Sequence, residues 1–417
     1  MINMISRNYV LSAIKHLETD RIPVDLGSTP SSGISAIAYN NLKKYLAIRS
    51  GSTRVYDVVQ QVVQIEDCMI ELFGIDVLDI GRAYNIMNTD WHEVTLSDGS
   101  RAEYPVWFKP VEQPDGSLFA YNNNGTLIGK MPKGATFFDQ TIFPYENGYP
   151  NNYTELPIAM RMVTWSALAH TPWDHISDTN FWMQLREKAL SLRNNTDKAL
   201  MINCGCNLFE WGTFLRKFDN FLIDIYTDQS EVERLLDALM EQHLQILTKV
   251  CEAIGDIVDI IRFGDDLGMD TGPFMSPSIY RKIFKPRHKQ LCTYVKKHSH
   301  MHTFLHSCGS IYKLIPDLIE AGYEIINPVQ TNCFEMEPFR LKQEFGKDVT
   351  FWGGGTDTRS ILNSGTVKDV KEDVKRRLEV FSQGGGFIFN PIHNILPDVP
   401  PENIVAMFEA VKEFEIN

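Results

Sequence analysis

Short apolar runs alternate with longer amphipathic stretches along most of the chain. Eight runs bounded by Gly, Pro or Asp have the length of β-strands: residues 22–27, 75–80, 199–204, 257–263, 302–306, 324–328, 349–353 and 386–391. From the third run onward, helical patterns follow at residues 229–254, 276–297, 311–321, 336–345, 367–381 and 401–414. An alternation of strands with helices predicts an α/β fold with a parallel sheet.

Eight strands in this order favour a closed (β/α)8 TIM barrel over an open doubly wound sheet, because no Gly-x-Gly-x-x-Gly turn follows the first strand. One stretch, at about residues 91–138, breaks the alternation. It carries the turn pairs Asp98-Gly99, Asp115-Gly116 and Asn124-Gly125, which predict an antiparallel β-meander inserted between barrel strands two and three. The sequence therefore predicts one barrel domain over residues 1–417 with this β-rich subregion inside it.

Composition and net charge limit the kinds of molecule that the protein is expected to bind and where it is expected to be found. With 43% hydrophobic and 22% charged residues, the 417-residue chain has ample material for a core, and its net charge of −13 argues against nucleic-acid binding. No run reaches about 18 apolar residues, and the N-terminus lacks the layout of a signal peptide, so we expect no membrane segment. Seven cysteines form an odd, sparse set that is typical of a reducing compartment, which predicts a cytoplasmic protein.

Functional groups of such barrels lie at the carboxyl ends of the strands. His306 and Cys308 end the fifth strand, and residues two apart on an extended backbone point the same way. An imidazole and a thiolate suit Zn²⁺, and His393 after the last strand is the expected third donor. The structural alternative is a hydrogen-bonded histidine beside a small buried cysteine. Cys204-Gly205-Cys206 offers a second donor pair, or merely a tight strand end.

Other polar residues follow the remaining strands. Asp79 and Arg82 either bind a charged substrate or form a plain ion pair. Asp265 and Asp266 are adjacent, so one is expected to serve a substrate while the other caps or turns the chain, and we assign the catalytic role to Asp265. The expected substrate-binding residues are Asn327, Gln330 and Asp357.

Several of these segments together resemble the uroporphyrinogen decarboxylase superfamily, which includes haem-pathway decarboxylases and zinc- and cobalamin-linked methyltransferases. The resemblance runs almost end to end through HLETDRIPVDLG, FGIDVLDIG, LRKFDNFLIDIY, FGDDLGMDTGPFMSP, HSCGSI, EIINPVQ, FWGGGTDT and GGGFIFNPIHNILPDVPPENIVAMFEA. It implies a (β/α)8 barrel. True decarboxylases carry an arginine-rich segment after the first strand, whereas residues 26–30 here contain no arginine, so the resemblance favours the methyltransferase branch.

That branch holds zinc with a His-x-Cys pair and a late cysteine. His306 and Cys308 match the pair, while His393 stands where the third thiolate is expected and would leave the metal one unit more positive. The resemblance implies methyl transfer between a small methylated substrate or thiol and a corrinoid (cobalamin) on a partner protein, and a homodimer.

Two alternatives stay open. One is a uroporphyrinogen decarboxylase-like enzyme acting on a tetrapyrrole or related acid, with Asp79 and His393 as catalytic groups. The other is a non-catalytic paralogue that binds a corrinoid or a partner.

Overall fold

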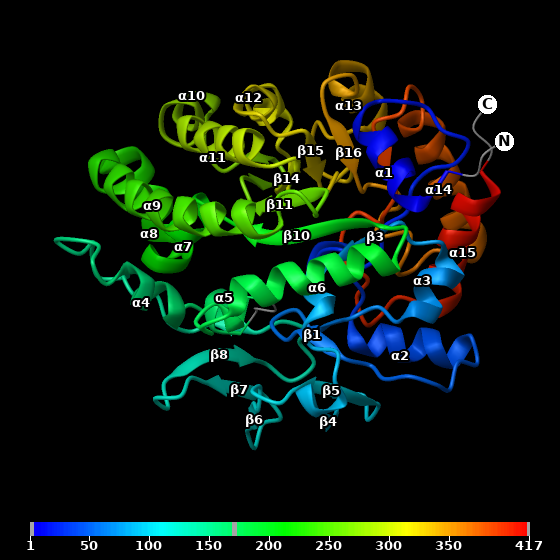
Figure 1. The fold of residues 1–417 in the computed structure, drawn as a ribbon, viewed down its shortest axis with the longest axis horizontal. Helices are drawn as coiled ribbons and strands as arrows, with labels where there is room; N and C mark the ends of the chain where they lie inside the picture. The colour runs from blue at the N-terminus through cyan, green and yellow to red at the C-terminus, as the bar shows by residue number, and fades with distance from the viewer. Residues whose placement is uncertain (1–3, 169–172, 415–417) are drawn as a thin grey trace.

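A seven-stranded parallel sheet curls through the centre of the protein, which we describe from a computed structural model covering residues 4–168 and 173–414 (Figure 1). Its strands, in spatial order, are β17 (Phe387–Ile388), β16 (Thr350–Trp352), β15 (Ile325–Asn327), β14 (His302–His306), β11 (Ile260–Gly264), β10 (Ala199–Gly205) and β3 (Val77–Asp79). All six neighbouring pairs are parallel. The predicted α/β class is confirmed, and the curled sheet is that of a TIM-like barrel.

The two edges of this sheet meet across one extended segment near the N-terminus. Val24 forms a parallel bridge with Phe389, next to β17, and Asp25 N–H donates to the Phe389 carbonyl at 2.8 Å. On the other side, Asp76 N–H donates to the Val24 carbonyl at 2.8 Å, just before β3. The Asp76 carboxylate also accepts two 2.7 Å bonds from Arg21, so the segment is held by charge as well as by backbone pairing.

The first predicted strand, residues 22–27, is therefore wrong in extent, since it forms only the bridge at Val24. Pro23 has no N–H to donate to a ladder. Gly27 has a φ of +86°, which turns the chain away from the sheet and into the short helix η1 (Pro30–Ser32). The other seven predicted strands are present, with shifted ends except at residues 302–306.

Helices surround the sheet because each carries one apolar face. They are α1 (Ser6–Ile14), α2 (Ala36–Tyr45), α3 (Asp67–Phe73), α4 (Leu156–Met162), α5 (Thr164–Ala167), α6 (Phe181–Asn195), α7 (Phe209–Arg216), α8 (Phe218–Thr227), α9 (Gln229–Ile254), α10 (Pro277–Ile279), α11 (Lys285–His298), α12 (Ile315–Ala321), α13 (Pro338–Phe345), α14 (Val367–Phe381) and α15 (Pro401–Glu413). In α9, for example, Val232, Leu235, Leu236 and Leu239 are fully buried at helical spacing.

Antiparallel structure occupies the chain between β3 and β10. β4 (Trp91–Thr95) pairs with β5 (Arg101–Pro105), and a four-stranded sheet follows, made of β6 (Val111–Glu112), β7 (Leu118–Tyr121), β8 (Leu127–Met131) and β9 (Asp139–Gln140). Two smaller hairpins are β1 (Val55–Asp57) with β2 (Val62–Val63), and β12 (Gly268–Met269) with β13 (Gly272–Pro273). β4 to β8 lie together below the barrel in Figure 1, and residues of β7, β8 and the segment between β5 and β6 line the cavity described below.

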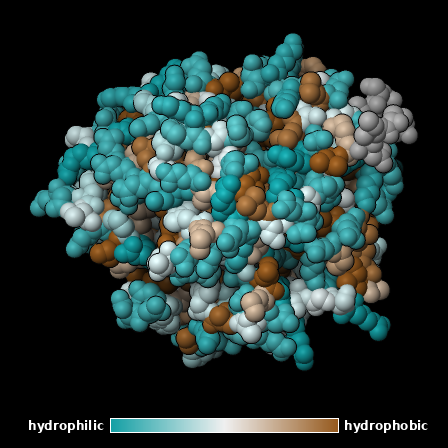
Figure 2. All heavy atoms as spheres, in the orientation of Figure 1, coloured by the Kyte–Doolittle hydropathy of each residue, from teal (hydrophilic) through white to brown (hydrophobic). Residues whose placement is uncertain are grey.

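On the face shown in Figure 2, hydrophobic residues are scattered among hydrophilic ones, as on ordinary globular proteins. Within the described ranges, every helix is too short or too polar to cross a lipid bilayer.

Candidate metal and substrate site

A cavity of about 1500 Å³ opens at the carboxyl ends of the barrel strands. Asp79 of β3, Arg262 of β11, and His306 and Cys308 at the end of β14 contribute to its wall. The antiparallel region adds aromatic side chains, among them Trp107. The cavity therefore lies where the barrel fold presents its functional groups.

His306, Cys308 and His393 meet in this cavity. One ligand atom from each lies within 4.8 Å of the others, Cys308 Sγ is 3.4 Å from His306 Nε2, and the two imidazole centroids are 5.9 Å apart. The His-x-Cys pair thus points to one spot, and the histidine after the last strand joins it from across the barrel.

Hydrogen bonds at Nδ1 orient the imidazoles of His306 and His393 and leave Nε2 of each ring as the atom that can bind a metal. Asn327 Nδ2 donates to the Trp352 carbonyl, so its Oδ1 faces His306 Nδ1 at 2.8 Å and accepts the proton there. His393 Nδ1 lies 2.7 Å from Asn394 Oδ1, which accepts its proton, although in the described ranges no second bond fixes the orientation of the Asn394 amide. Both Nε2 atoms are then unprotonated lone-pair donors, as metal-binding histidines require.

Burial keeps these groups neutral. Desolvation, helped by the charge of Arg262, lowers the pKa of His306 well below its ordinary value, and desolvation likewise lowers the pKa of His393. Desolvation and the neighbouring carboxyl groups of Asp266 and Glu210 raise the pKa of the Cys308 thiol. Two neutral imidazoles and one thiol fit Zn²⁺, which makes a buried thiol a ligand by displacing its proton.

The structure places the two adjacent aspartates in different surroundings. The Asp265 carboxylate is fully buried and accepts bonds from the backbone N–H groups of Phe209 and Glu210, at 3.0 and 2.9 Å, where it caps α7, and lies 3.1 Å from His288 Nε2. Asp266 lines the cavity and accepts a 2.7 Å bond from Cys308 N–H. Asp265 is therefore a positioning group away from the cavity, and Asp266 is the carboxylate beside the cluster.

Three residues expected to bind substrate do not line this cavity. Asn327 stands behind His306 and orients it. Gln330 accepts a hydrogen bond from Gly309 N–H and so fixes the loop that follows Cys308. Asp357 accepts bonds from Asn332, Arg359 N–H and Ser360 in the loop after β16. All three shape the loops around the site.

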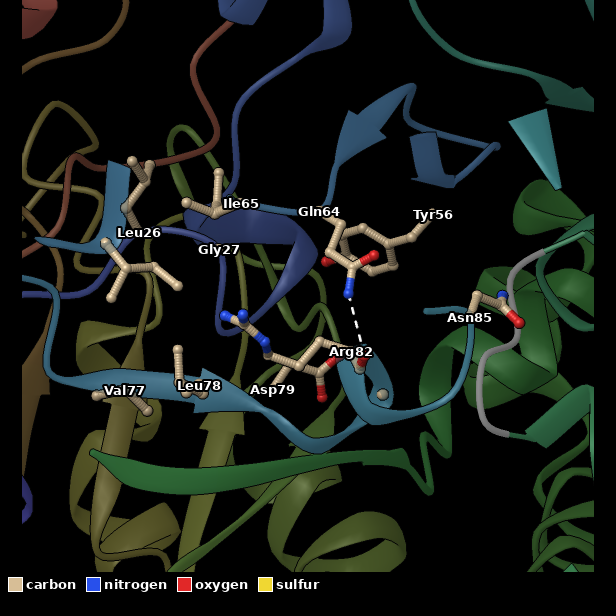
Figure 3. Close-up of a pocket in the computed structure, with 12 residues that line it drawn as sticks. Leu26, Gly27, Tyr56, Gln64, Ile65, Val77, Leu78, Asp79, Arg82 and Asn85 are labelled. Carbon is tan, nitrogen blue, oxygen red and sulfur yellow. Dashed lines mark hydrogen bonds between the residues drawn. The ribbon is translucent and has the colours of Figure 1, made fainter. Parts of the chain in front are cut away.

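Asp79 reaches two spaces at once. It lines the large cavity and also a small one of about 30 Å³ that borders Gln64 and Arg82 (Figure 3). Asn203 Nδ2 donates to its carboxylate at 3.1 Å. Desolvation raises the pKa of Asp79 to about 7, against smaller opposing effects that include the charge of Arg82. Arg82 itself forms an ion pair with Asp67 rather than with Asp79.

Two cavity residues were missed from the sequence. Arg262 interrupts the apolar strand β11, and a lone charge inside such a run was the available signal. Glu210, in the first turn of α7, accepts a 3.1 Å bond from Asp266 N–H. Desolvation and the nearby aspartates raise the pKa of Glu210 well above its ordinary value, which favours its neutral form.

Cys204 and Cys206, the alternative donor pair, also line the cavity, with their Sγ atoms 3.8 Å apart. Among the described residues, the one cluster of three or more potential ligands is His306, Cys308 and His393, which does not include them.

Comparison with known proteins agrees with this architecture. Residues 209–414 match the uroporphyrinogen decarboxylase (URO-D) family, so this part of the chain belongs to that family, and the predicted superfamily is confirmed. A uroporphyrinogen decarboxylase of Legionella pneumophila is 26% identical over 219 residues, which are 50% of this chain and 55% of that protein. A methylcobamide:CoM methyltransferase, MtaA, of Methanosarcina barkeri is 25% identical over 181 residues, which are 42% of this chain and 49% of that protein.

In each of these two alignments the chain spans about half the length of the relative. A solved methyltransferase from Methanosarcina mazei matches the fold with a TM-score of 0.60 and 17% identity over 99% of both chains. Proteins similar to this chain are therefore enzymes of two kinds, decarboxylases and methyltransferases.

Proposed function

We propose that the protein is a zinc-dependent methyltransferase that moves a methyl group between a small methylated substrate or thiol and the corrinoid of a partner protein. The observation that carries the proposal is the convergence of His306, Cys308 and His393, each with a donor atom within 4.8 Å of the others in a large cavity. The name of the Methanosarcina barkeri relative, a methylcobamide methyltransferase, supports the choice of corrinoid.

The three donors would hold Zn²⁺, which supplies Lewis acidity toward a thiol or an ether oxygen. Asn327 keeps His306 Nε2 directed to the shared point, and Asp266 fixes the backbone of Cys308. Trp107 and the other aromatic residues add apolar surface to the cavity wall. Asn327 and Asp266 thus provide the orientation that methyl transfer requires.

A site of two histidines and one thiolate carries one negative charge fewer than a site of one histidine and two thiolates. With His306, Cys308 and His393 as ligands, a divalent metal retains one net positive charge instead of none. A more positive centre favours polarisation of a weakly basic group, such as an ether oxygen, in addition to binding a thiolate.

Elemental analysis tests the metal site directly. Protein purified without chelator or nickel affinity resin is expected to carry one zinc per chain, with strong loss in His306→Ala and Cys308→Ala. Cys204→Ala is the matched control, because it removes a cavity thiol outside the cluster. Absence of zinc, together with unchanged methylcobalamin absorbance in the presence of thiols, would refute the proposal.

A decarboxylase acting on a tetrapyrrole or related acid is the second candidate, and one observation favours it. Asp79 is a buried carboxyl in the cavity whose pKa, raised by desolvation to about 7, lets it exchange a proton near neutral pH. Release of carbon dioxide from such an acid by metal-free enzyme, abolished in Asp79→Asn, would select this function. We rank it second because residues 26–30 contain no arginine to hold several carboxylates.

A further inference from the structure

Arg262 is a charged side chain that forms no hydrogen bond or ion pair with the residues that the structure describes. It lies on β11 between the buried residues Ile261 and Phe263, and its side chain lines the cavity. Its Nε is buried without a hydrogen bond, and in the described parts of the chain the guanidinium forms neither a hydrogen bond nor an ion pair. Arg262 as a whole is half-buried, and a guanidinium with its Nε buried in this state costs free energy unless another group pairs with it.

Three other arginines that reach into the protein interior each form an ion pair with an aspartate. Arg21 binds Asp76 with two 2.7 Å bonds, Arg193 forms an ion pair with Asp259, and Arg377 Nε is 2.9 Å from Asp373. Arg262 departs from this pattern, and its side chain faces the large cavity, which is open to a partner molecule from solution.

The surroundings of Arg262 suit an anion. Glu210 and Asp266 are the carboxyl groups with the largest effect on the pKa of Arg262, yet neither forms an ion pair with it in the described parts of the chain. Burial raises the pKa of Glu210 well above its ordinary value, which favours its neutral form. In the same cavity, Tyr56 has a buried hydroxyl without a hydrogen-bond partner, which offers a second donor.

We propose that Arg262 is the specificity residue that binds an organic oxyanion, such as a carboxylate, on the substrate. This inference rests on the proposed function in that it assigns the substrate of that same cavity an acidic group. Guanidinium pairs such a group with two parallel bonds, which also orients the rest of the molecule. A neutral substrate of the same shape would leave Arg262 unpaired and would bind more weakly.

Isothermal titration of 3-phenylpropionate and its neutral isostere 3-phenylpropionamide tests this. The native protein is expected to bind the carboxylate at least about tenfold more tightly than the amide, since charge-assisted bonds are roughly twice as strong as neutral ones. Arg262→Met should bind the two within about twofold of each other, with the amide affinity unchanged, and Arg262→Lys should keep part of the preference. With 2-phenylethanesulfonate, equal affinity assigns the site to oxyanions in general, and weaker affinity assigns it to carboxylates.

Lys109→Met is the matched control, because Lys109 is a cation on the exposed rim of the same cavity. It should retain the tenfold preference. A native protein without preference, an Arg262→Met protein that retains it, or its loss in Lys109→Met would overturn the proposal. The titrations are run on protein incubated with zinc and on zinc-free protein. Failure to take up zinc would reject the methyltransferase, while a carboxylate preference of the zinc-free protein would still support the role of Arg262.

Discussion

Replacing Asp79 by asparagine should stabilise the protein at alkaline pH. Asp79 is 8% exposed, and desolvation raises its pKa from 3.8 to about 7. The folded protein therefore binds this proton more tightly than the unfolded chain, and the ionised carboxylate opposes folding. Stability is lost as the pH rises from about 4 toward 7, and the full cost is present above pH 7.

The size of the effect follows from the two pKa values. At about 1.36 kcal/mol per pH unit, the gap between 3.8 and about 7 sets an upper limit of about 4 kcal/mol. Asp79→Asn should exceed the wild type by about 2–4 kcal/mol in free energy of unfolding at pH 8. This advantage should shrink by about 2–3 kcal/mol at pH 5, where most of the carboxyl group is protonated in the folded state.

Urea unfolding at pH 5, 6, 7 and 8, followed by circular dichroism, measures this difference. Arg82, Arg262 and Asn203 remain in both proteins, so their own effects largely cancel. Asp219→Asn, which removes an exposed carboxylate on α8, is the control and should show a flat difference. A pH-independent difference for Asp79→Asn would refute the desolvation argument.

Three further predictions concern the groups around the cluster. Asn327→Ala removes the acceptor that orients His306, so zinc affinity measured by chelator competition should fall about 10–100-fold. Asp265→Ala leaves two N-terminal N–H groups of α7 without their cap and should lower the free energy of unfolding by about 3 kcal/mol, while the zinc content per folded chain stays unchanged. Gly309 has a φ of +86°, and a Cβ there would lie 2.2 Å from the backbone of Gly268, so Gly309→Ala should lower the melting temperature and the zinc content together.

The sequence predicted the site correctly where the alternation of side chains along a regular strand decides which residues face the cavity. Residues 302–306 form an apolar run whose polar ends fix its boundaries, and alternation along it correctly aimed His306 toward the cavity. The same rule does not apply to Asp265 and Asp266, because β11 ends at Gly264 and the backbone beyond it is not a strand. Arg262 lies in the middle of β11, so a prediction built on the polar residues at strand ends does not include it.

Long-range contacts were also beyond the sequence. No local pattern relates Asn327 to His306, or the start of α7 to Asp265, since each pair is set by how neighbouring barrel strands register. The third donor, His393, was predicted from its place after the last strand, but its closeness to His306 and Cys308 is likewise set by the closure of the barrel.

The short segment around Val24, which joins β17 to β3, ties early residues to late ones. During synthesis on the ribosome, the ring cannot close until β17 has emerged, so the half-made barrel exposes two unpaired edges for most of translation. A circular permutant whose new termini interrupt the chain on either side of Val24 should therefore fail to close the barrel.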